Sequence, residues 1–383
     1  MAVADSVKNI GTGDIQNGSV TNNKLENDSI LINGDSIALG ASASVPGASN
    51  ALINGDMVIW ARGTSIVSDS TPVANSDDTY ICDRWILLSD GNDIVDVTRS
   101  STGVDGGSEY SCQLEVETVD KKFGILQIIE AVNCNELIGE KASLSFYAKV
   151  AGSGKLDNVK AAIISWAGTA DSPTSDIVSA WGTEGTNPTL ATSWTYENTP
   201  ADLNVTTSMA QYKIENIDID TSSTKNVAVF IWSDVTDTDL GDDLYITDVQ
   251  LTPTTAVVPF DRKPISQTAS DCERYYETSM TWGTVGAYQG AQVKMGVGSA
   301  TDGAATGNCG GNRYNTRKRT TPTVTLYHQD GTSGAVYTIH NAAKITGVVA
   351  QHITDMGYLF AAKASAFNQN YGYYYQWIAE AEL

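Results

Sequence analysis

The chain has 383 residues, 18% of them charged, and a formal net charge of −22. This negative charge argues against nucleic acid and anionic membrane surfaces as partners. No run of about 18 apolar residues occurs, so we expect no membrane insertion, and the first ten residues lack the pattern of a secretory signal. The low charged fraction disfavours long exposed helices. Abundant β-branched and turn-forming residues favour strands.

Residues 1–50 contain no aromatic residue and only sparse aliphatic ones. Two short units, Gly13–Val20 and Asn23–Ile30, resemble each other. One such chain buries too little apolar surface to offset its ordering entropy. We therefore expect a stalk in which three copies wind together, and a disordered tail is the alternative.

Residues 51–265 carry 13 Lys and Arg against 32 Asp and Glu, whereas residues 266–383 carry eight of each. This shift in charge predicts a domain boundary at the segment Pro259–Pro264, which has proline at both ends. The chain thus divides into an N-terminal stalk (1–50), a central domain (51–265) and a C-terminal domain (266–383).

Short runs of alternating apolar residues recur through the central domain, without a helical period. They predict a β-sandwich. The segment Lys122–Ala131 fits either a strand or a helix, and its isoleucines favour the strand. The other predicted strands are Ala142–Val150, Val159–Trp166, Gln211–Ile219, Asn226–Trp232 and Leu244–Leu251.

The C-terminal domain opens with a predicted helix, Ser270–Thr278, because Ser270 and Glu273 form a capping-box pattern. Its last predicted strand places Tyr371, Tyr373, Tyr375 and Trp377 on one face, which favours a core or a subunit interface over a ligand platform. The predicted strands are Val293–Val297, Thr323–Tyr327, Ala335–Ile339, Gly357–Ala361 and Tyr371–Ile378.

The five cysteines show no C-x-x-C spacing, and their number is odd. They stand at Cys82, Cys112, Cys134, Cys272 and Cys309. We expect buried free thiols in a protein that is made in a reducing cytoplasm. A disulfide between Cys112 and Cys134 is the alternative.

Several motifs together resemble those of phage tail-fibre or virion-appendage proteins, of the kind found in phages of marine bacteria. The resemblance implies an all-β, trimeric fibre. It would have a central jelly roll akin to carbohydrate-binding modules. We expect residues 266–383 to form a smaller C-terminal β-sandwich that closes the trimer, lies distal and faces the receptor. A long shaft is absent, which leaves tail, capsid or another fibre open as the attachment point. The motifs are Ile32–Gly40, Leu52–Ser65, Asp83–Trp85, Gly139–Lys149, Val249–Pro264, Cys272–Tyr276, Thr321–Tyr327 and Gln376–Leu383.

The residues do not favour an enzyme. His328, His340 and His352 are spaced by 12 residues each, which matches no metal site or catalytic triad, and no G-x-S-x-G motif occurs. The 45 acidic residues leave paired carboxylates for glycoside hydrolysis open. Phage depolymerases usually resemble long parallel β-helices, and this chain lacks such a repeat. We expect a protein without enzymatic activity.

An acidic segment, residues 234–243, has five aspartates and a glycine, which suits a hard cation with oxygen ligands. Asp237, Asp239 and Asp242 are the candidate ligands of a structural calcium ion, and a solvated acidic loop is the alternative. The sequence requires no other cofactor.

Sugar binding calls for exposed aromatic rings beside amide or acid groups. Trp181, Trp194 and Tyr196 are candidates, with the sandwich core as the alternative for the tryptophans. Tyr374 with Gln376 is a further candidate. Tyr314 and Arg317 belong to the basic segment Asn312–Arg319, which could meet anionic lipopolysaccharide or pair with the acidic domain of a neighbouring subunit.

The sequence thus predicts a homotrimeric phage fibre protein, made in the host cytoplasm, that joins another virion protein through residues 1–50. It would adhere to host surface polysaccharide or lipopolysaccharide. A capsid decoration or purely structural fibre is one alternative function, and a polysaccharide depolymerase is another.

Overall fold

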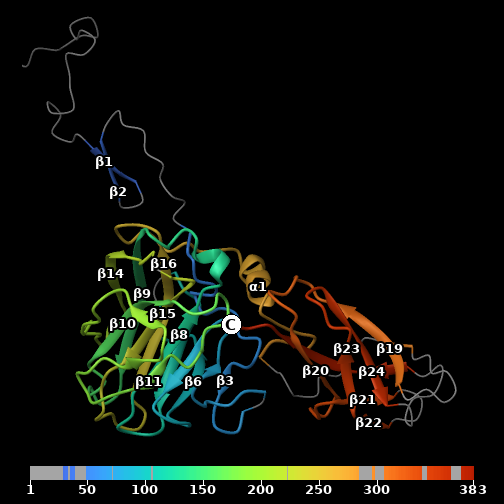
Figure 1. Cartoon of the computed structure of the whole chain (residues 1–383). Helices are drawn as coiled ribbons and strands as arrows, with labels where there is room; N and C mark the ends of the chain where they lie inside the picture. Colours follow the sequence, from blue (N-terminus) through green and yellow to red (C-terminus); the bar gives the residue numbers. More distant parts are fainter. Residues whose placement is uncertain are drawn as a thin grey trace, which may run out of the picture.

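The computed structural model describes residues 29–32, 35–38, 49–70, 72–104, 107–221, 223–283, 296–297, 306–338, 343–363 and 372–383. Strands make up nearly all of the regular secondary structure of these residues, as predicted. Figure 1 shows a large β lobe and a smaller C-terminal one, with helix α1 and the C-terminus between them. Strands β1 (Ser29–Ile32) and β2 (Asp35–Ala38) form an antiparallel hairpin. The rest of 1–48 lies outside the described residues, so the stalk stays a prediction.

The large lobe is a sandwich of two six-stranded antiparallel sheets, which confirms the predicted β-sandwich. The first sheet has the order β13-β10-β15-β8-β5-β4 and the second β14-β9-β16-β7-β6-β3. The first sheet contains β4 (Thr79–Tyr80), β5 (Ile86–Ser89), β8 (Phe123–Ile128), β10 (Val159–Trp166), β13 (Trp194–Tyr196) and β15 (Asn226–Ser233). The second contains β3 (Ser65–Ile66), β6 (Val95–Ser100), β7 (Ser111–Val116), β9 (Lys141–Ala151), β14 (Ala210–Asp218) and β16 (Asp243–Thr252).

The first sheet is buried on both faces. In β15, Val229 and Ile231 point into the core between the sheets, whereas Phe230 and Trp232 belong to a second cluster on the outer face. Residues 167–193, with the hairpin of β11 (Val178–Ala180) and β12 (Thr189–Leu190), cover that outer face. This explains why all eight residues of β15 are buried, and why the strand reads as a continuous apolar run.

A buried lysine fixes the covering hairpin to the sheet. The Lys122 ammonium donates to the carbonyl oxygens of Thr183 at 2.8 Å and Thr186 at 3.0 Å, and it lies 2.5 Å from Asp234 Oδ1. Lys160 meets the other oxygen of Asp234 at 2.6 Å. The ammonium of Lys122 thus satisfies turn carbonyls that burial would otherwise leave without a donor.

The described residues of the C-terminal lobe form three small antiparallel sheets. Its core contains Leu326, Val336, Tyr358 and Trp377. The sheets are β17 (Tyr276–Thr278), β26 (Gln376–Glu380) and β20 (Thr323–Tyr327); β18 (Gly296–Val297), β25 (Gly372–Tyr374), β21 (Ala335–Thr338) and β22 (Lys344–Thr346); and β19 (Thr306–Arg313), β24 (Gly357–Lys363) and β23 (Val348–Gln351).

The predicted helix Ser270–Thr278 is wrong in position. Helix α1 is Ile265–Glu273, begins after Pro264 and has no side-chain cap. It ends where it does because the next residues, Tyr275 and Tyr276, are buried and lead into β17. Tertiary burial overrides the capping-box pattern here.

The predicted strand Tyr371–Ile378 is two strands, β25 and β26, in different sheets. The chain changes sheets at Tyr375, which is buried with Trp377 in the lobe's core. The core interpretation is therefore confirmed for these two rings. Tyr371 and the side chain of Tyr373 lie outside the described residues.

Four cysteines, at 82, 112, 134 and 272, are free and buried, as predicted. The alternative disulfide between Cys112 and Cys134 is therefore wrong. The side chain of Cys309 lies outside the described residues. In the described ranges, no helix combines the length and apolar character needed to span a membrane.

Candidate functional site

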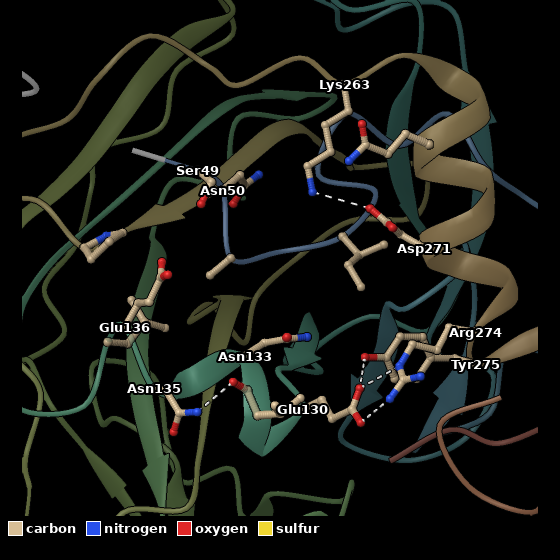
Figure 2. A pocket seen from close by; sticks show the side chains of 16 residues that line it. Ser49, Asn50, Glu130, Asn133, Asn135, Glu136, Lys263, Asp271, Arg274 and Tyr275 are labelled. Atoms are coloured by element: carbon tan, nitrogen blue, oxygen red, sulfur yellow. Dashed lines mark hydrogen bonds and ion pairs between the residues drawn. The ribbon is translucent and has the colours of Figure 1, made fainter. Parts of the chain in front are cut away.

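A cavity of about 740 Å³ opens between the sandwich and helix α1 (Figure 2). One wall consists of residues 49–53 and the 3₁₀ helix Ala131–Cys134 with its flanks, and the other is the face of α1. This size is within the range of small-molecule sites in proteins, which is about 300–1,000 Å³. We call this space the junction cavity.

The inner end of the junction cavity contains a three-residue cluster. Arg274 donates two hydrogen bonds to the Glu130 carboxylate, at 2.9 and 2.7 Å, and the Tyr275 hydroxyl donates a third at 2.8 Å (Figure 2). Burial by itself would raise the pKa of Glu130, but the bonds from Arg274 and Tyr275 outweigh it and leave the pKa below its ordinary value. Glu130 is thus held as a carboxylate.

A second ion pair lies at the outer edge of the cavity. Lys263 Nζ lies 3.4 Å from Asp271 Oδ2, which comes from α1 (Figure 2). Lys263 and Arg274 are the two cationic residues of the cavity lining. Each is therefore already neutralised by a carboxylate of its own chain.

Four polar side chains of the lining are available to a ligand. Ser49, Asn133, Glu136 and Gln267 are exposed, and within the described part of the chain their side chains make no hydrogen bond or ion pair. An amide both donates and accepts hydrogen bonds, as a sugar hydroxyl does. The exposed side chain of Val132 adds an apolar surface. The set suits an uncharged, hydroxyl-rich ligand better than an anion.

Two buried arginines join the lobes beside the cavity. The Arg84 guanidinium lies 3.7 Å from the ring centre of Tyr275, and that of Arg62 lies 3.8 Å from the ring centre of Tyr276. Both arginines also form ion pairs with Glu382, the Arg62 pair at 2.8 Å. We call these five residues the arginine junction.

Four of the eight motifs that resemble those of phage fibre proteins converge on this junction. Arg62 belongs to Leu52–Ser65, Arg84 to Asp83–Trp85, and Glu382 to Gln376–Leu383. The two tyrosines come from Cys272–Tyr276. These motifs therefore hold the two lobes together, and one of them, Cys272–Tyr276, supplies Arg274 and Tyr275 of the cavity lining.

The aromatic candidates of the central domain are packed inside it. Trp194 is 4% exposed and packs on Trp166 with ring centres 5.3 Å apart, and Trp181 is 9% exposed and packs on Phe230. Their burial under the hairpin supports the core alternative. Tyr196 is half-buried, and its hydroxyl donates to the carbonyl of Pro188 at 2.8 Å. The structure does not bring these rings to the junction cavity.

The candidates of the C-terminal lobe are also dispersed. Tyr314 and Gln376 are buried, and half-buried Tyr374 stacks on Tyr337 with ring centres 6.0 Å apart. Arg317 is exposed and lies 2.6 Å from Asp355. A sugar-binding role for these residues stays a prediction.

Neighbours in the basic segment find partners inside the chain as well. Lys318 pairs with buried Glu277 at 2.5 Å. Arg319 donates to the carbonyl oxygens of Ala381 at 3.0 Å and Glu382 at 2.7 Å. Two cations of the segment, Arg317 and Lys318, are thus paired with carboxylates of the same lobe, and Arg319 is engaged by backbone carbonyls.

Two of the three candidate calcium ligands, Asp239 and Asp242, already have partners, whereas Asp237 is exposed on the same loop. Asp242 accepts from the backbone and the hydroxyl of Ser153, at 2.6 and 2.8 Å, and Asp239 lies 2.8 Å from Lys155. The calcium site stays a prediction. In the described ranges, the carboxylates that gather within 4.8 Å are instead Asp93, Asp96 and Glu117. Desolvation and these acidic neighbours raise the pKa of Asp96 to about 6.

The histidines do not assemble a catalytic group in the described part of the chain. His328 is buried and lies 2.8 Å from Asp330, His352 is on a separate turn after β23, and His340 lies outside the described residues.

Sequence reasoning missed the free groups of the cavity. Ser49, Asn133, Glu136 and Gln267 stand in no motif. The sequence offered one signal for the cavity. Lys263 and Arg274, on either side of α1, belong to the resemblance motifs Val249–Pro264 and Cys272–Tyr276.

No family model matches the sequence, and no curated protein matches it. Among solved structures, the enzymatically active domain of tailspike protein 4 from bacteriophage CBA120 is 17% identical over 44% of this chain, with a TM-score of 0.28. This chain covers only 19% of that structure.

Two carbohydrate-binding modules match larger shares. TmCBM61, solved with β-1,4-galactotriose, is 15% identical and covers 54% of this chain and 99% of its own, with a TM-score of 0.29. The CBM22-1 xylan-binding domain of Paenibacillus barcinonensis Xyn10C is 10% identical and covers 56% and 100%, with a TM-score of 0.30. At these scores the likenesses carry no conclusion about what this chain binds.

Proposed function

We propose that the chain is a non-enzymatic phage fibre protein that binds glycan of the host surface in the junction cavity. The observation that carries the proposal is the set of free groups in the lining. Two amides and a hydroxyl, from Asn133, Gln267 and Ser49, face a cavity whose cations are already paired. Such groups match the alternating donors and acceptors of sugar hydroxyls.

The rest of the proposed role follows from multivalency. An open, solvent-exposed site with few free groups binds weakly. Three weak sites on one trimer gain on the order of a hundredfold or more in avidity when they engage the same surface. Residues 1–50 would supply the trimer and the link to another virion protein, and the particle would carry the protein on its tail or capsid.

The test is binding of the full chain to an array of bacterial surface polysaccharides. The double substitution Asn133→Ala with Gln267→Ala should weaken binding about tenfold or more, because two side-chain partners of the sugar are lost. Gln351→Ala, which removes an amide from β23 in the other lobe, should leave binding unchanged. A wild-type protein that binds no glycan, or a double variant that binds as well as the wild type, would count against the proposal.

The non-enzymatic part needs its own measurement. Glu130 is held by Arg274 and Tyr275 with a lowered pKa, so it does not offer the proton that a general acid in glycoside hydrolysis must donate. Polysaccharide incubated with the protein should keep its chain length. Shortening of the polysaccharide would identify a depolymerase, and an intact polymer with no binding would favour a decoration or structural fibre.

A further inference from the structure

The charges of the junction cavity point to a more specific ligand. Its lining has three carboxylates, Glu130, Glu136 and Asp271, and two cations, Arg274 and Lys263. Each cation is paired with a carboxylate, so the charge left over belongs to Glu136. Among the described residues no cation lies within ion-pair distance of Glu136. It lies across the cavity from α1 (Figure 2).

The surroundings strengthen this negative charge. Residues 51–265, which supply most of the lining, carry 32 acidic against 13 basic residues. An anionic sugar entering the cavity would find no free cation and would face an unneutralised carboxylate. Repulsion of like charges and incomplete solvation both oppose its binding.

A cationic group would instead meet a free acceptor. The Glu136 side chain is exposed on the segment that follows the 3₁₀ helix Ala131–Cys134, so it can reach a ligand without breaking an internal bond. A protonated amine beside it would form a charge-assisted hydrogen bond, which is stronger than a neutral one.

We propose that the junction cavity selects glycans by charge: it prefers sugars that bear a free amine, accepts neutral ones, and excludes those that bear carboxylate, sulfate or phosphate. Glu136 is the residue that sets this preference. The inference rests on the proposed glycan-binding function and adds the chemical class of the ligand.

The experiment compares three oligosaccharides of equal length with the full chain by calorimetric titration, at a pH where the amines are protonated. They are oligomers of glucosamine, of N-acetylglucosamine and of galacturonic acid. We expect the glucosamine oligomer to bind about tenfold tighter than its N-acetylated form, which corresponds to one charge-assisted bond. The galacturonate oligomer should show no binding. The preference should shrink as salt is added.

The variants Glu136→Gln and Glu140→Gln form a matched pair. Both residues are exposed and only four positions apart, but Glu140 is not in the cavity lining. E136Q should equalise binding of the glucosamine and N-acetylglucosamine oligomers, whereas E140Q should keep the wild-type ratio. Melting temperatures of both variants check that they fold.

The outcomes separate the two proposals. All three oligosaccharides could bind equally, with each binding weakened by the Asn133→Ala, Gln267→Ala double substitution. In that case the proposed selection by charge is wrong, and the proposed glycan site is supported. The proposed selection by charge is also wrong if E136Q leaves unchanged the ratio of affinities for the glucosamine and N-acetylglucosamine oligomers. If none of the three binds, the preference for amino sugars is wrong, and the polysaccharide array decides separately whether the cavity binds glycan.

Discussion

Arg62 and Arg84 place fully buried guanidinium groups against tyrosine rings. A flat, weakly hydrated guanidinium can stack on a ring and still donate along its edge, which a lysine ammonium cannot do. The charge nevertheless has to be matched, because an unpaired buried cation is costly. Glu382 pairs with both side chains, and buried Asp83 lies 3.8 Å from Arg62 as a second carboxylate. Substituting either arginine by lysine would therefore remove more than a hydrogen bond.

Asp96 offers a test of the acidic cluster at the level of one residue. Its pKa is raised to about 6 by desolvation and by Glu117, Glu115 and Asp93. The protonated form is thus favoured by folding. Its contribution to stability is fully present below about pH 4 and is lost as the pH rises through about 6. Asp96→Asn, which stays neutral, should exceed the wild type in stability by roughly 0.5–1 kcal/mol above that pH, after solvent screening.

Thermal unfolding at pH 4 and pH 8 checks this expectation. The difference between D96N and the wild type should be close to zero at the lower pH and positive at the higher one. Asp69→Asn, at an exposed position outside the acidic cluster, serves as the control for the loss of a surface carboxylate. A D96N protein that is less stable than the wild type at pH 8 would contradict the argument.

At the level of elements, the β11–β12 hairpin depends on the ammonium of Lys122. Lys122→Met should leave three turn carbonyls, those of Trp181, Thr183 and Thr186, without their donor. It also breaks a buried ion pair with Asp234, so we expect a loss of about 3 kcal/mol. Hydrogen exchange should accelerate in residues 178–190, because the hairpin is no longer fixed to the sheet.

The adjacent lysine provides the control. The side chain of Lys121 is 39% exposed and pairs with exposed Asp90, so Lys121→Met should cost under about 0.5 kcal/mol and leave exchange in the hairpin unchanged. Equal effects of the two substitutions would show that the hairpin does not rely on the buried contact.

Strands of the sandwich were predictable because burial leaves a local pattern. β10 and β20 have the predicted limits, and β9, β15 and β16 differ from them by a residue or two. The predictions were wrong for elements whose limits are set by tertiary contacts. α1 ends at Glu273, earlier than predicted, because Tyr275 and Tyr276 are buried at the junction, and the predicted last strand divides because Tyr375 turns into the core. Neither event has a signal in neighbouring residues.

On the scale of the whole molecule, Glu382 should couple the two lobes. Glu382→Gln leaves two buried guanidinium groups without their shared carboxylate, and we expect a loss of about 3 kcal/mol or more. Glu380→Gln is the matched control. That side chain is 46% exposed, lies 3.3 Å from Arg62, and should contribute less than about 1 kcal/mol.

Calorimetry and small-angle scattering measure the coupling. For E382Q we expect a lower first transition, separation of the unfolding of the two lobes, and a larger radius of gyration. If E382Q and E380Q unfold at the same temperature in a single transition, Glu382 does not hold the lobes together.

The oligomeric state is a separate prediction. The chain has a mass of 40.7 kDa, and the proposed trimer has three times that value. Light scattering coupled to size-exclusion chromatography measures it directly. A mass equal to one chain would contradict the trimer and, with it, the avidity argument.

The candidate site could not be predicted from the sequence, although several of its framing residues could. Asn133 and Gln267 are far apart along the chain and meet only because the arginine junction docks α1 against the sandwich. Isolated residues outside any motif give no indication in the sequence that they will lie close together in the fold. The resemblance motifs contain the residues of the arginine junction, but they do not contain the unpaired polar side chains of the junction cavity.

The arginine junction also decides how the molecule would carry tension. Arg62 lies only 12 residues after Asn50, where the sandwich begins, and it bonds directly to Glu382 of the other lobe. A pull exerted between residue 50 and the C-terminal lobe would thus pass through a short route of side-chain ion pairs. Asn50 also bonds to β16, where its side-chain amide donates to the carbonyl oxygen of Val249 at 3.0 Å, so part of the load would enter the second sheet at that strand.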